Sequence, residues 1–399
     1  MRIATITSGH IPSAWAHSIN FVRQASAFQR IGHDVTVYSV LREQESAAVE
    51  GEDLSEFYGI EAVKFAFEKE AGWQYYIERP LVQKLFFGFQ KVSKQRFFPL
   101  SKGQKRIAKR VAESNIDMVY CRCFDVVPEL VRQKVPVVFE SHNLKISPQR
   151  PIVKQILALA DSEYLGGLVV LSKPVKAVWE SFGFPAHKIH VMPTGVNLLR
   201  YAPDQLEGKR SSIRASLGWT EQDYVAAYTG HLYRGRGMEY ILEAARQTPE
   251  IKYLIVGGRP DDVAYYQEMG KELANVHFTG LVPNGEVPAF TEAADVLLMP
   301  YTRDTPTWRQ MSPVKLYEYM AAGRPIISTD LPPLLEALDA EEEALFVPEK
   351  DGKALVEAIL RLQAEPELAR KLSENNLVSV TKHSLAARAQ RIVEIGLGR

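Results

Sequence analysis

Residues 310–330 read Gln310-Met311-Ser312-Pro313-Val314-Lys315-Leu316-Tyr317-Glu318-Tyr319-Met320-Ala321-Ala322-Gly323-Arg324-Pro325-Ile326-Ile327-Ser328-Thr329-Asp330. Ser312 and Pro313 predict a helix start, because a serine side chain can cap free backbone N–H groups and proline suits the first helical position. Gly323 predicts the end of that helix, since Arg324-Pro325 cannot continue it. The apolar run at 326–329 predicts a buried strand, so the stretch is typical of an α/β domain.

The start of this expected helix is a candidate anion site. Free N–H groups and the helix dipole favour negative charge there, and Lys315 lies in the first turn. Glu318, one turn deeper, could accept hydrogen bonds from vicinal hydroxyls such as those of a ribose. Together these residues indicate a sugar nucleotide as the ligand. The alternative is an ordinary amphipathic helix that binds nothing.

The same stretch resembles the donor-binding segment of the family 4 retaining glycosyltransferases, bacterial-type nucleotide-sugar-dependent enzymes of the GT-B fold. In that family an E-x7-E pattern leads into a helix with the sequence E-A/Y-M-A-x-G-x-P. Glu318 matches the second Glu, which in the family holds the ribose hydroxyls of the donor. The first Glu would fall at position 310, where this chain has Gln310, so an uncharged amide would take over its contact with the donor sugar. The resemblance implies a donor site that includes Gln310, Met311, Ser312, Pro313, Val314, Lys315 and Glu318.

The composition fits a chain with large cores and two domains. It has 399 residues, 46% of them hydrophobic, and no apolar run is long enough to cross a bilayer. The sequence opens directly with an expected strand, so we expect no signal peptide. The two cysteines, Cys121 and Cys123, lie too close together for a useful disulfide and lack the partners of a zinc site. A reducing cytoplasm is therefore the expected location.

Positive charge is concentrated in the first half of the chain. Residues 1–195 hold 25 Lys and Arg against 19 Asp and Glu, a net charge of +6, and the totals of 48 each leave −6 for residues 196–399. This asymmetry predicts an anionic partner for the first domain, either a membrane surface or a phosphorylated acceptor.

The first domain begins as a parallel, doubly wound sheet. A strand over 2–7, a loop over 8–18, a helix over 20–30 and a strand over 34–40 have the order typical of that architecture. The pattern G-x-G-x-x-G is absent, so a dehydrogenase-type dinucleotide fold has no support. The resemblance places Gly9, His10 and His17 on the acceptor side, with Gly9 also within reach of the donor. For each histidine, an ordinary surface or turn position is the alternative.

A basic, aromatic segment spans residues 79–110, which contain no acidic residue. Basic and aromatic side chains interleave as they do in segments that lie on an anionic bilayer. The alternative is a pair of helices that buries its Phe side chains and solvates its Lys side chains. No nucleic-acid-binding module accompanies the charge, so nucleic acid is not an expected partner. The candidates for contact with the acceptor or the membrane are Lys84, Phe86, Phe87, Lys91, Lys94 and Arg96.

His142 follows an expected buried strand over 135–140. Ligands of open α/β sheets bind beyond the carboxyl ends of the strands, which is where His142 should lie. In the family that the chain resembles, a His at the end of this strand contacts the donor sugar, and His142 takes that role by position. The alternative is a structural histidine held by hydrogen bonds.

The second domain carries a glycine-rich turn after its first strand. The strand is expected over 224–229, the turn over 230–237 and a helix over 238–246. A P-loop is excluded because Arg236 and Gly237 stand where its Lys and hydroxyl residue would be. The turn is similar to the family loop G-R-L-x-x-x-K-G, whose two basic residues hold the donor diphosphate. Arg236 stands at the Lys position and His231 at the Arg position, and Arg234 could supply the charge that His231 carries only in part near neutral pH.

Two later passages complete the expected donor site. Gly257 lies in the turn after the strand at 252–256, and Leu281 and Val282 follow the strand that begins at Val276. In the family, the passage around Leu281 and Val282 places backbone groups against the nucleobase. The polar loop at 301–309 is expected to overhang the donor sugar.

The chain is therefore identified as a member of the family 4 glycosyltransferases, with two Rossmann-like doubly wound domains. We expect an acceptor-binding domain over 1–197, a linker over 198–222, a donor-binding domain over 223–384 and a helix over 385–399 that returns to the first domain. The activity implied is the transfer of a hexose, in the EC 2.4 class, with retention of configuration, from a nucleotide-diphosphate sugar to a glycan or lipid-linked acceptor. Arg236, Lys315 and helix N–H groups would stabilise the leaving phosphate, with His142 beside the sugar and with no metal or other cofactor. A sugar-nucleotide 2-epimerase of the same fold and a non-catalytic nucleotide-sugar-binding subunit are the alternatives.

Overall fold

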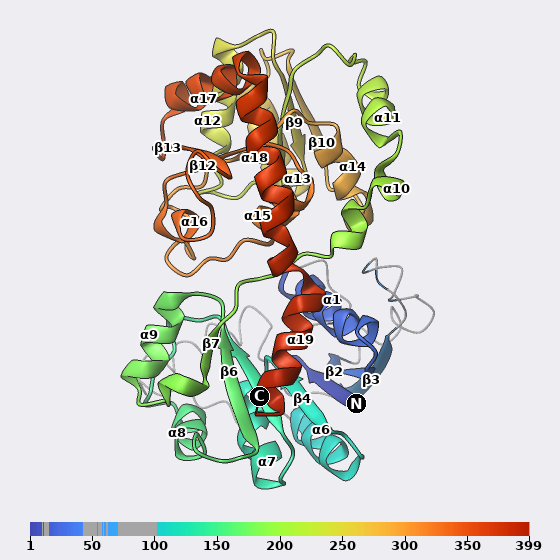
Figure 1. Ribbon diagram of the computed structural model, residues 1–399, viewed down its shortest axis with the longest axis vertical. Helices are drawn as coiled ribbons and strands as arrows, with labels where there is room; N and C mark the ends of the chain where they lie inside the picture. Colours follow the sequence, from blue (N-terminus) through green and yellow to red (C-terminus); the bar gives the residue numbers. More distant parts are fainter. Residues whose placement is uncertain are drawn as a thin grey trace. The chain divides into compact units, whose positions relative to one another are not determined.

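The computed structural model describes residues 1–9, 11, 16–42, 54, 58, 60, 63–70 and 102–398. Contacts between residues divide the chain into two units. The first unit holds Met1–Met192 together with the chain from Arg388 onward, and the second holds Pro193–Ala387. Each unit is built on one parallel β-sheet with helices packed against it (Figure 1).

The sheet of the first unit has seven strands in the order β3-β2-β1-β4-β5-β6-β7. All its neighbouring strands are parallel, and the direction of winding reverses between β1 and β4, as in a Rossmann-like fold. The strands are β1 (Arg2–Ile6), β2 (Asp34–Arg42), β3 (Lys64–Glu70), β4 (Met118–Cys121), β5 (Val137–Ser141), β6 (Leu165–Val170) and β7 (Ile189–Val191). The helices are α1 (Ala16–Arg30), α6 (Lys102–Glu113), α7 (Val127–Arg132), α8 (Pro151–Ala158), α9 (Lys173–Ser181) and α19 (Leu385–Gly396), with the 3-10 turns η1 (Phe124–Val126) and η2 (Ala186–Lys188).

The central strands of this sheet are buried on both faces, since helices cover both sides of a doubly wound sheet. Every residue of β4 and β5 is buried. On one face, Trp179 of α9 is fully buried and meets the rings of Phe124, Phe139 and Phe184 edge to face, at centroid distances of 6.0, 5.6 and 5.8 Å. This aromatic cluster fixes α9 against the sheet.

The C-terminal helix α19 packs closely on the same sheet through glycines. A Cβ atom at Gly167 in β6 would lie 2.6 Å from Cγ2 of Ile395, and one at Gly396 would lie 2.1 Å from the sulfur of Met118. Larger residues at these positions would push the helix away. The glycines thus allow α19 to bring its side chains into the first unit.

The sheet of the second unit has six parallel strands in the order β10-β9-β8-β11-β12-β13. Its winding reverses between β8 and β11, so the turns after these strands meet at the switch point where ligands bind in such folds. The strands are β8 (Val225–Thr229), β9 (Lys252–Val256), β10 (Val276–Gly280), β11 (Val296–Met299), β12 (Ile326–Thr329) and β13 (Ala344–Val347). The helices are α10 (Pro203–Leu206), α11 (Lys209–Ser216), α12 (Met238–Gln247), α13 (Pro260–Met269), α14 (Val287–Glu292), α15 (Val314–Ala321), α16 (Pro332–Leu335), α17 (Gly352–Ala364) and α18 (Pro366–Ser379), with the 3-10 turns η3 (Leu198–Tyr201), η4 (Asn284–Glu286) and η5 (Val380–His383).

Residues 198–222, which we expected to connect the domains, belong to the second unit instead. They form η3, α10 and α11, and the Arg214 side chain of α11 is only 1% exposed. Its Nη2 lies 2.7 Å from Oδ2 of Asp295, and its Nε donates to the carbonyl of Ala293 at 3.0 Å. An ion pair to the buried Arg214 thus helps to hold the segment in place.

The helix and strand expected from residues 310–330 are present as α15 and β12. However, Ser312 does not cap the helix as predicted. Pro313 is the residue before the helix, and no side chain caps its N-terminus. Ser312 instead accepts a hydrogen bond on its Oγ from the backbone N–H of Thr194, at 2.9 Å. A tertiary partner has therefore replaced the local capping bond.

Candidate active site

Lys315, in the first turn of α15, has the most unusual environment in the second unit. Its Nζ lies 3.5 Å from the ring centroid of Tyr228, at the end of β8, and 5.2 Å from that of Tyr301, after β11. Part of the residue reaches solvent, but the Nζ atom itself is buried and has no hydrogen-bond partner among the described residues. Burial and the nearby Arg236 lower the pKa of Lys315 well below its usual value, while Glu318 opposes the shift. An anionic ligand would supply the missing partner.

Arg236 lies beside the same aromatic rings. Its guanidinium carbon is 4.3 Å from the ring centroid of Tyr301 and 4.4 Å from that of Tyr233, whose hydroxyl accepts a hydrogen bond from Nη2. Arg236 and Lys315 thus gather at the ring of Tyr301, as expected for residues that bind one diphosphate. Tyr228 was not among the residues predicted from the sequence, and Tyr301 was predicted only as the first residue of the loop expected to overhang the donor sugar. Their positions directly at the carboxyl ends of β8 and β11 could have identified them.

The glycine-rich turn after β8 is shaped by close contacts. A Cβ atom at Gly237, whose φ is +77°, would lie 1.9 Å from the carbonyl oxygen of Pro300. A Cβ atom at Gly230, whose φ is +121°, would lie 3.0 Å from Nζ of Lys315. Only glycine fits these contacts and backbone angles, so the turn can pass close to both β11 and α15.

Glu318 lies one turn deeper in α15 and is 9% exposed. Its Oε1 is 3.5 Å from Nη1 of Arg200, and Nη2 of Arg200 donates to the carbonyl of Asn284. Arg200 lies in η3, far from Glu318 in the sequence, so no local pattern pointed to it. A carboxylate held on one side by arginine still has lone pairs that can accept hydrogen bonds from hydroxyl groups.

The charged form of His231 is disfavoured in the free protein. Burial lowers the pKa of His231, and the positive charges of Arg259, Arg236 and Lys315 lower it further. The uncharged imidazole is therefore favoured near pH 7 before a ligand binds, and the role of His231 at the phosphates stays a prediction. Negative charge placed between these cations would raise the pKa again.

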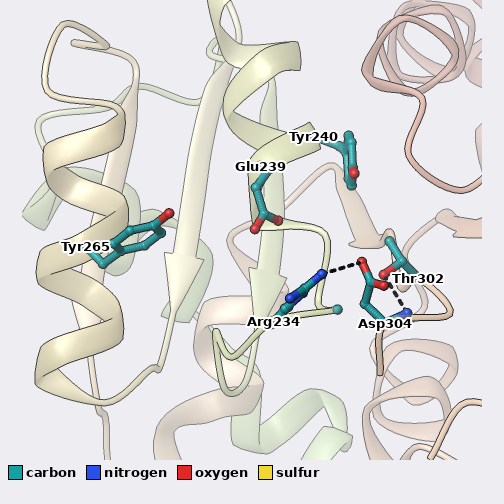
Figure 2. Close-up of a pocket in the computed structure, with 7 residues that line it drawn as sticks. Arg234, Glu239, Tyr240, Tyr265, Thr302 and Asp304 are labelled. Carbon is teal, nitrogen blue, oxygen red and sulfur yellow. Dashed lines mark hydrogen bonds and ion pairs between the residues drawn. The ribbon is translucent and has the colours of Figure 1, made fainter. Parts of the chain in front are cut away.

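Arg234, expected to compensate for His231, pairs with Asp304 at 4.0 Å and has an 85% exposed side chain. Arg234 and Asp304 both line a pocket of about 350 Å³ (Figure 2). Asp304 also lies 3.1 Å from Nζ of Lys350. The pocket is lined by Arg234, Gly235, Glu239, Tyr240, Tyr265, Thr302 and Asp304. Among the predicted donor residues, only Arg234 lines this pocket.

The turns after β8, β9 and β10 come together through the backbone. The N–H of Gly257 donates to the carbonyl of Gly280 at 2.8 Å, and a Cβ atom at Gly257 would lie 2.7 Å from the carbonyl oxygen of Gly230. Leu281, which follows β10, is 65% exposed, and Val282 is half-buried. These two residues therefore lie at the edge of the sheet next to the Gly257 turn.

Residues 310–313 lead into α15 and are tied to neighbouring segments. Gln310 is half-buried and its N–H donates to the carbonyl of Thr307 at 3.1 Å, while Met311 is buried. The carbonyl of Ser312 accepts a hydrogen bond from Oγ1 of Thr194 at 2.8 Å. Pro313 and Val314 are half-buried at the start of the helix. The segment is thus held at both ends by hydrogen bonds.

His142 lies in the first unit, one residue beyond β5, and both of its ring nitrogens are engaged. Nη2 of Arg122 lies 2.8 Å from Nδ1, and Nε2 meets Oε1 of Glu140. Burial lowers the pKa of His142 to about 4, with a further contribution from Arg122. These contacts match the alternative of a hydrogen-bonded structural histidine, and a contact with the donor sugar stays a prediction.

Gly9 and His17 lie near Arg122 in the same unit. A Cβ atom at Gly9 would lie 3.0 Å from Cδ2 of His17, and the carbonyl of His17 accepts a hydrogen bond from Nη1 of Arg122 at 3.1 Å. The structure therefore places Gly9, His17, Arg122 and His142 in one group. The other predicted acceptor or membrane residues lie outside the described part of the chain: His10, Lys84, Phe86, Phe87, Lys91, Lys94 and Arg96.

Within the described ranges, no group of three or more His, Cys, Asp or Glu side chains is placed to hold a metal ion, and metal independence stays a prediction. None of the helices found in those ranges is long and apolar enough to span a bilayer.

The chain matches two family models that together cover most of its length. The model described as "Glycosyl transferases group 1" matches residues 209–377, and "Glycosyltransferase Family 4" matches residues 21–200. TuaH of Bacillus subtilis strain 168, named for teichuronic acid biosynthesis, is 32% identical over 149 residues, which are 36% of this chain and 35% of TuaH. WcaL of Escherichia coli K12, named for colanic acid biosynthesis, is 25% identical over 244 residues, which are 58% of this chain and 55% of WcaL. The chain thus spans about half the length, or less, of these relatives.

Solved structures with low identity show the fold. Alr3699/HepE of Anabaena, solved in complex with UDP, superimposes with a TM-score of 0.69 at 14% identity and 99% coverage of both chains. A UDP-GlcNAc 2-epimerase of Neisseria meningitidis, bound to UDP-GlcNAc, gives 0.60 at 15% identity with both chains fully covered. With two Rossmann-like parallel units and both family models matched, the chain is a GT-B protein that belongs to the group 1/family 4 glycosyltransferases.

Proposed function

We propose that the protein transfers a sugar from a nucleotide-diphosphate sugar to a glycan or lipid-linked acceptor during polysaccharide assembly, with retention of anomeric configuration. The observation that carries this proposal is the buried ammonium of Lys315, which lacks a hydrogen-bond partner among the described residues and lies beside Arg236. The names of TuaH and WcaL support polysaccharide assembly as the setting. In this proposal the second unit binds the donor and the first unit binds the acceptor.

The proposed chemistry is electrostatic. The bond from the anomeric carbon to the diphosphate breaks, a bond from an acceptor oxygen to that carbon forms, and the acceptor hydroxyl gives up its proton. Negative charge grows on the diphosphate, where Arg236, Lys315 and the first N–H groups of α15 would stabilise it. Glu318 would hold the ribose, and the backbone near Leu281 and Val282 would contact the base.

A donor panel tests this proposal. Thermal shift with UDP-, GDP- and ADP-sugars should identify one nucleotide that stabilises the protein, and UDP is the first to try because HepE was solved with it. Product analysis with lipid-linked and soluble acceptors should then show acceptor-dependent consumption of the donor. An α-linked product from an α-linked donor would demonstrate retention. Donor binding without any turnover across the acceptor panel would instead favour a non-catalytic subunit, the reading that Gln310 and the neutral His231 suggest.

A sugar-nucleotide 2-epimerase is the second candidate, because the first unit does contain a carboxylate next to a histidine. Glu140 contacts His142, as an acid–base pair would. However, Glu140 is also bound by Arg388 at 2.6 Å and by the Tyr120 hydroxyl, and these partners disfavour its use as a base. Incubation of the donor alone separates the two functions, since an epimerase forms product without an acceptor.

Membrane association through residues 79–110 is a separate proposal, with the reaction placed in the cytoplasm. Its described part is α6, which exposes Lys105 and Lys109 and buries Ile107 and Val111. An exposed basic face is what an anionic surface would bind. Co-sedimentation with liposomes over a salt series tests it, and equal pelleting with neutral and anionic vesicles would count against it.

A further inference from the structure

Six polar side chains of the first unit form one network centred on the carboxylate of Glu140. They come from segments far apart in the sequence, and Glu140 itself is 5% exposed. The members are Gln24 of α1, Tyr120 of β4, Arg122, Glu140 of β5, His142 and Arg388 of α19. The chemistry proposed above uses none of them, and His142 was predicted only from its position to contact the donor sugar.

Arg388 is the member that α19 contributes, and it is 8% exposed. Its Nη2 donates to Oε2 of Glu140 at 2.6 Å, and its Nη1 donates to Oε1 of Gln24 at 3.0 Å and lies 3.3 Å from the Tyr120 hydroxyl. Removing two charges from water is costly, and apolar side chains would fill such a space at less cost. The arrangement therefore calls for a role beyond packing.

The two carboxylate oxygens of Glu140 have different partners. Oε2 accepts from Arg388 and from the Tyr120 hydroxyl, whereas Oε1 meets Nε2 of His142. The planar guanidinium of Arg388, anchored also to Gln24, fixes the plane of the carboxylate. Oε1 is thereby held toward the imidazole.

Arg122 completes the constraint on the His142 ring. Arginine can only donate, so Nδ1 of His142 must accept the 2.8 Å hydrogen bond from Nη2 of Arg122. Nε2 then carries the ring proton and donates a hydrogen bond to Glu140. The side chain of His142 nevertheless remains 28% exposed, at the carboxyl end of the sheet where ligands bind in this class of fold.

We propose that Arg388 is a positioning residue for His142: acting through Glu140, it holds the imidazole in the Nε2–H tautomer and in one orientation. A residue of the C-terminal helix α19 thus sets the tautomer and the orientation of the His142 imidazole, which follows β5 and is far away in the sequence. Only the assignment of His142 to a substrate rests on the proposed function. The tautomer and the orientation follow from the contacts within the first unit.

Electrostatics give the direction of the effect. The charged or titratable groups that face the imidazole are Arg122, Glu140 and Arg388, with Tyr120 behind Glu140. Arg388 lowers the pKa of His142 and Glu140 raises it. Loss of Arg388 would remove the smallest of the contributions that lower the pKa of His142, and burial and Arg122 would remain, so the pKa should rise from about 4 by only part of the difference to its ordinary value of 6.5.

The test is long-range ¹H–¹⁵N spectroscopy of the full chain labelled at histidine, between pH 4 and 8, with His142 assigned by comparison with His142→Gln. In the wild-type protein we expect the Nε2–H tautomer without titration down to about pH 5.5. Arg388→Met should shift the titration of His142 to a higher pH than in the wild-type protein. Arg388→Lys keeps the charge but not the guanidinium plane, so it should move the ring signals in the same direction by less.

Arg391→Met is the matched control, because Arg391 is on the same helix, is 50% exposed and pairs with Glu394 at the surface. It should leave the His142 signals at their wild-type values. If Arg388→Met does not fold, the His142 signals of Arg388→Lys are sufficient to test the proposal. The proposal is overturned if the wild-type imidazole titrates as a free histidine does, or if Arg388→Lys gives the same His142 signals as Arg391→Met.

Activity provides an independent readout. If the wild-type protein transfers sugar, Arg388→Lys should lower kcat about tenfold and leave the KM for the donor within about twofold, because the proposed donor contacts lie in the second unit. If kcat and the amount of folded protein fall equally, Arg388 has only a structural role, and the proposal that its positioning of His142 supports sugar transfer is overturned. If the wild-type protein transfers no sugar, the proposed function fails while the spectroscopic result stands by itself.

Discussion

Lys315 shows at the scale of one residue how burial reveals a ligand site. Its ammonium faces aromatic rings and has no hydrogen-bond partner in the described part of the chain. A protein gains nothing in stability from such a group, since desolvation penalises the charge. Its presence is explained if a bound anion completes the site.

Replacing Lys315 with Met should separate stability from binding. The free protein should be stabilised by about 1 kcal/mol, because an unpaired buried cation is removed. Affinity for the nucleotide diphosphate should fall about 10- to 100-fold, as expected for the loss of one charge-assisted contact. Thermal unfolding and calorimetric titration measure both effects. Lys350→Met is the control, since that lysine is 46% exposed and should change either quantity little. Unchanged affinity in Lys315→Met would rule out the diphosphate contact.

Binding of a nucleoside diphosphate should be accompanied by proton uptake. The pKa values of Lys315 and His231 are lowered in the free protein, and the phosphates should raise both, so protons are gained at any pH between the free and bound values. Titration calorimetry of UDP at pH 7 to 9, in buffers of different ionisation enthalpy, measures the number of protons. Lys315→Arg should bind with smaller uptake, because arginine is always charged. The uptake left in that variant is the share of His231, and equal uptake in both proteins would exclude a titrating Lys315.

At the scale of elements, the turn between β8 and α12 is the part of the site that depends most on backbone geometry. Its residues 230–237 must pass between the start of α15 and the end of β11. The N–H of Thr302 and the hydroxyl of Thr305 both donate to the carbonyl of Gly235, at 3.0 and 2.8 Å. The turn and the loop after β11 are therefore expected to move as one piece, which keeps Arg236 against Tyr301.

Gly237→Ala should destabilise the second unit by about 2–4 kcal/mol. The new Cβ would meet the Pro300 carbonyl at 1.9 Å, and the φ of +77° adds backbone strain. Gly218→Ala is the matched control, since Gly218 has a φ of +71° but no atom within 4 Å of the added Cβ. That variant should cost only the strain, about 1 kcal/mol. Equal losses in the two variants, measured by denaturant unfolding, would show that the contact with Pro300 is unimportant.

At the scale of the whole molecule, each unit has its own hydrophobic core, and each has its own charged network. The network of the first unit makes its stability depend on pH. Burial lowers the folded-state pKa of His142 to about 4, below its unfolded value of 6.5. The unfolded chain therefore binds more protons in this interval, so the stability from neutral His142 is present above pH 6.5 and is lost as the pH falls toward 4.

His142→Gln should flatten this pH dependence. The amide can keep a hydrogen bond to Arg122 and one to Glu140 but does not titrate. The unfolding free energy that is lost between pH 6.5 and pH 4 should be about 2 kcal/mol smaller than in the wild-type protein, after allowance for the partly exposed ring. Chemical denaturation at several pH values measures it. His187→Gln changes an exposed histidine of η2 and should leave the profile as it is. A wild-type profile in His142→Gln would show that this histidine is not held neutral.

Local patterns in the chain were sufficient for the elements near the donor site. Strand β9 has the bounds that the pattern predicted, and α15 and β12 lie where Ser312-Pro313, Gly323 and the apolar run placed them. Strands β3 and β13 were not predicted, and charged residues interrupt the apolar pattern of β3. Arg236, Lys315 and Glu318 come from the second unit, whereas Gly9 and His142, which the resemblance also assigns to the donor, come from the first.

The parallel, doubly wound arrangement and the choice of Lys315 and Glu318 came from neighbours in the chain, because helix starts, glycine turns and apolar runs act over a few residues. The two-domain GT-B architecture came from the resemblance to the family. The partners of buried charges came only from the folded protein. Arg388 meets Glu140 across 248 positions, and Arg200 meets Glu318 across 118. The strength of such contacts depends on which side chains lose water together, and no local pattern in a sequence records that.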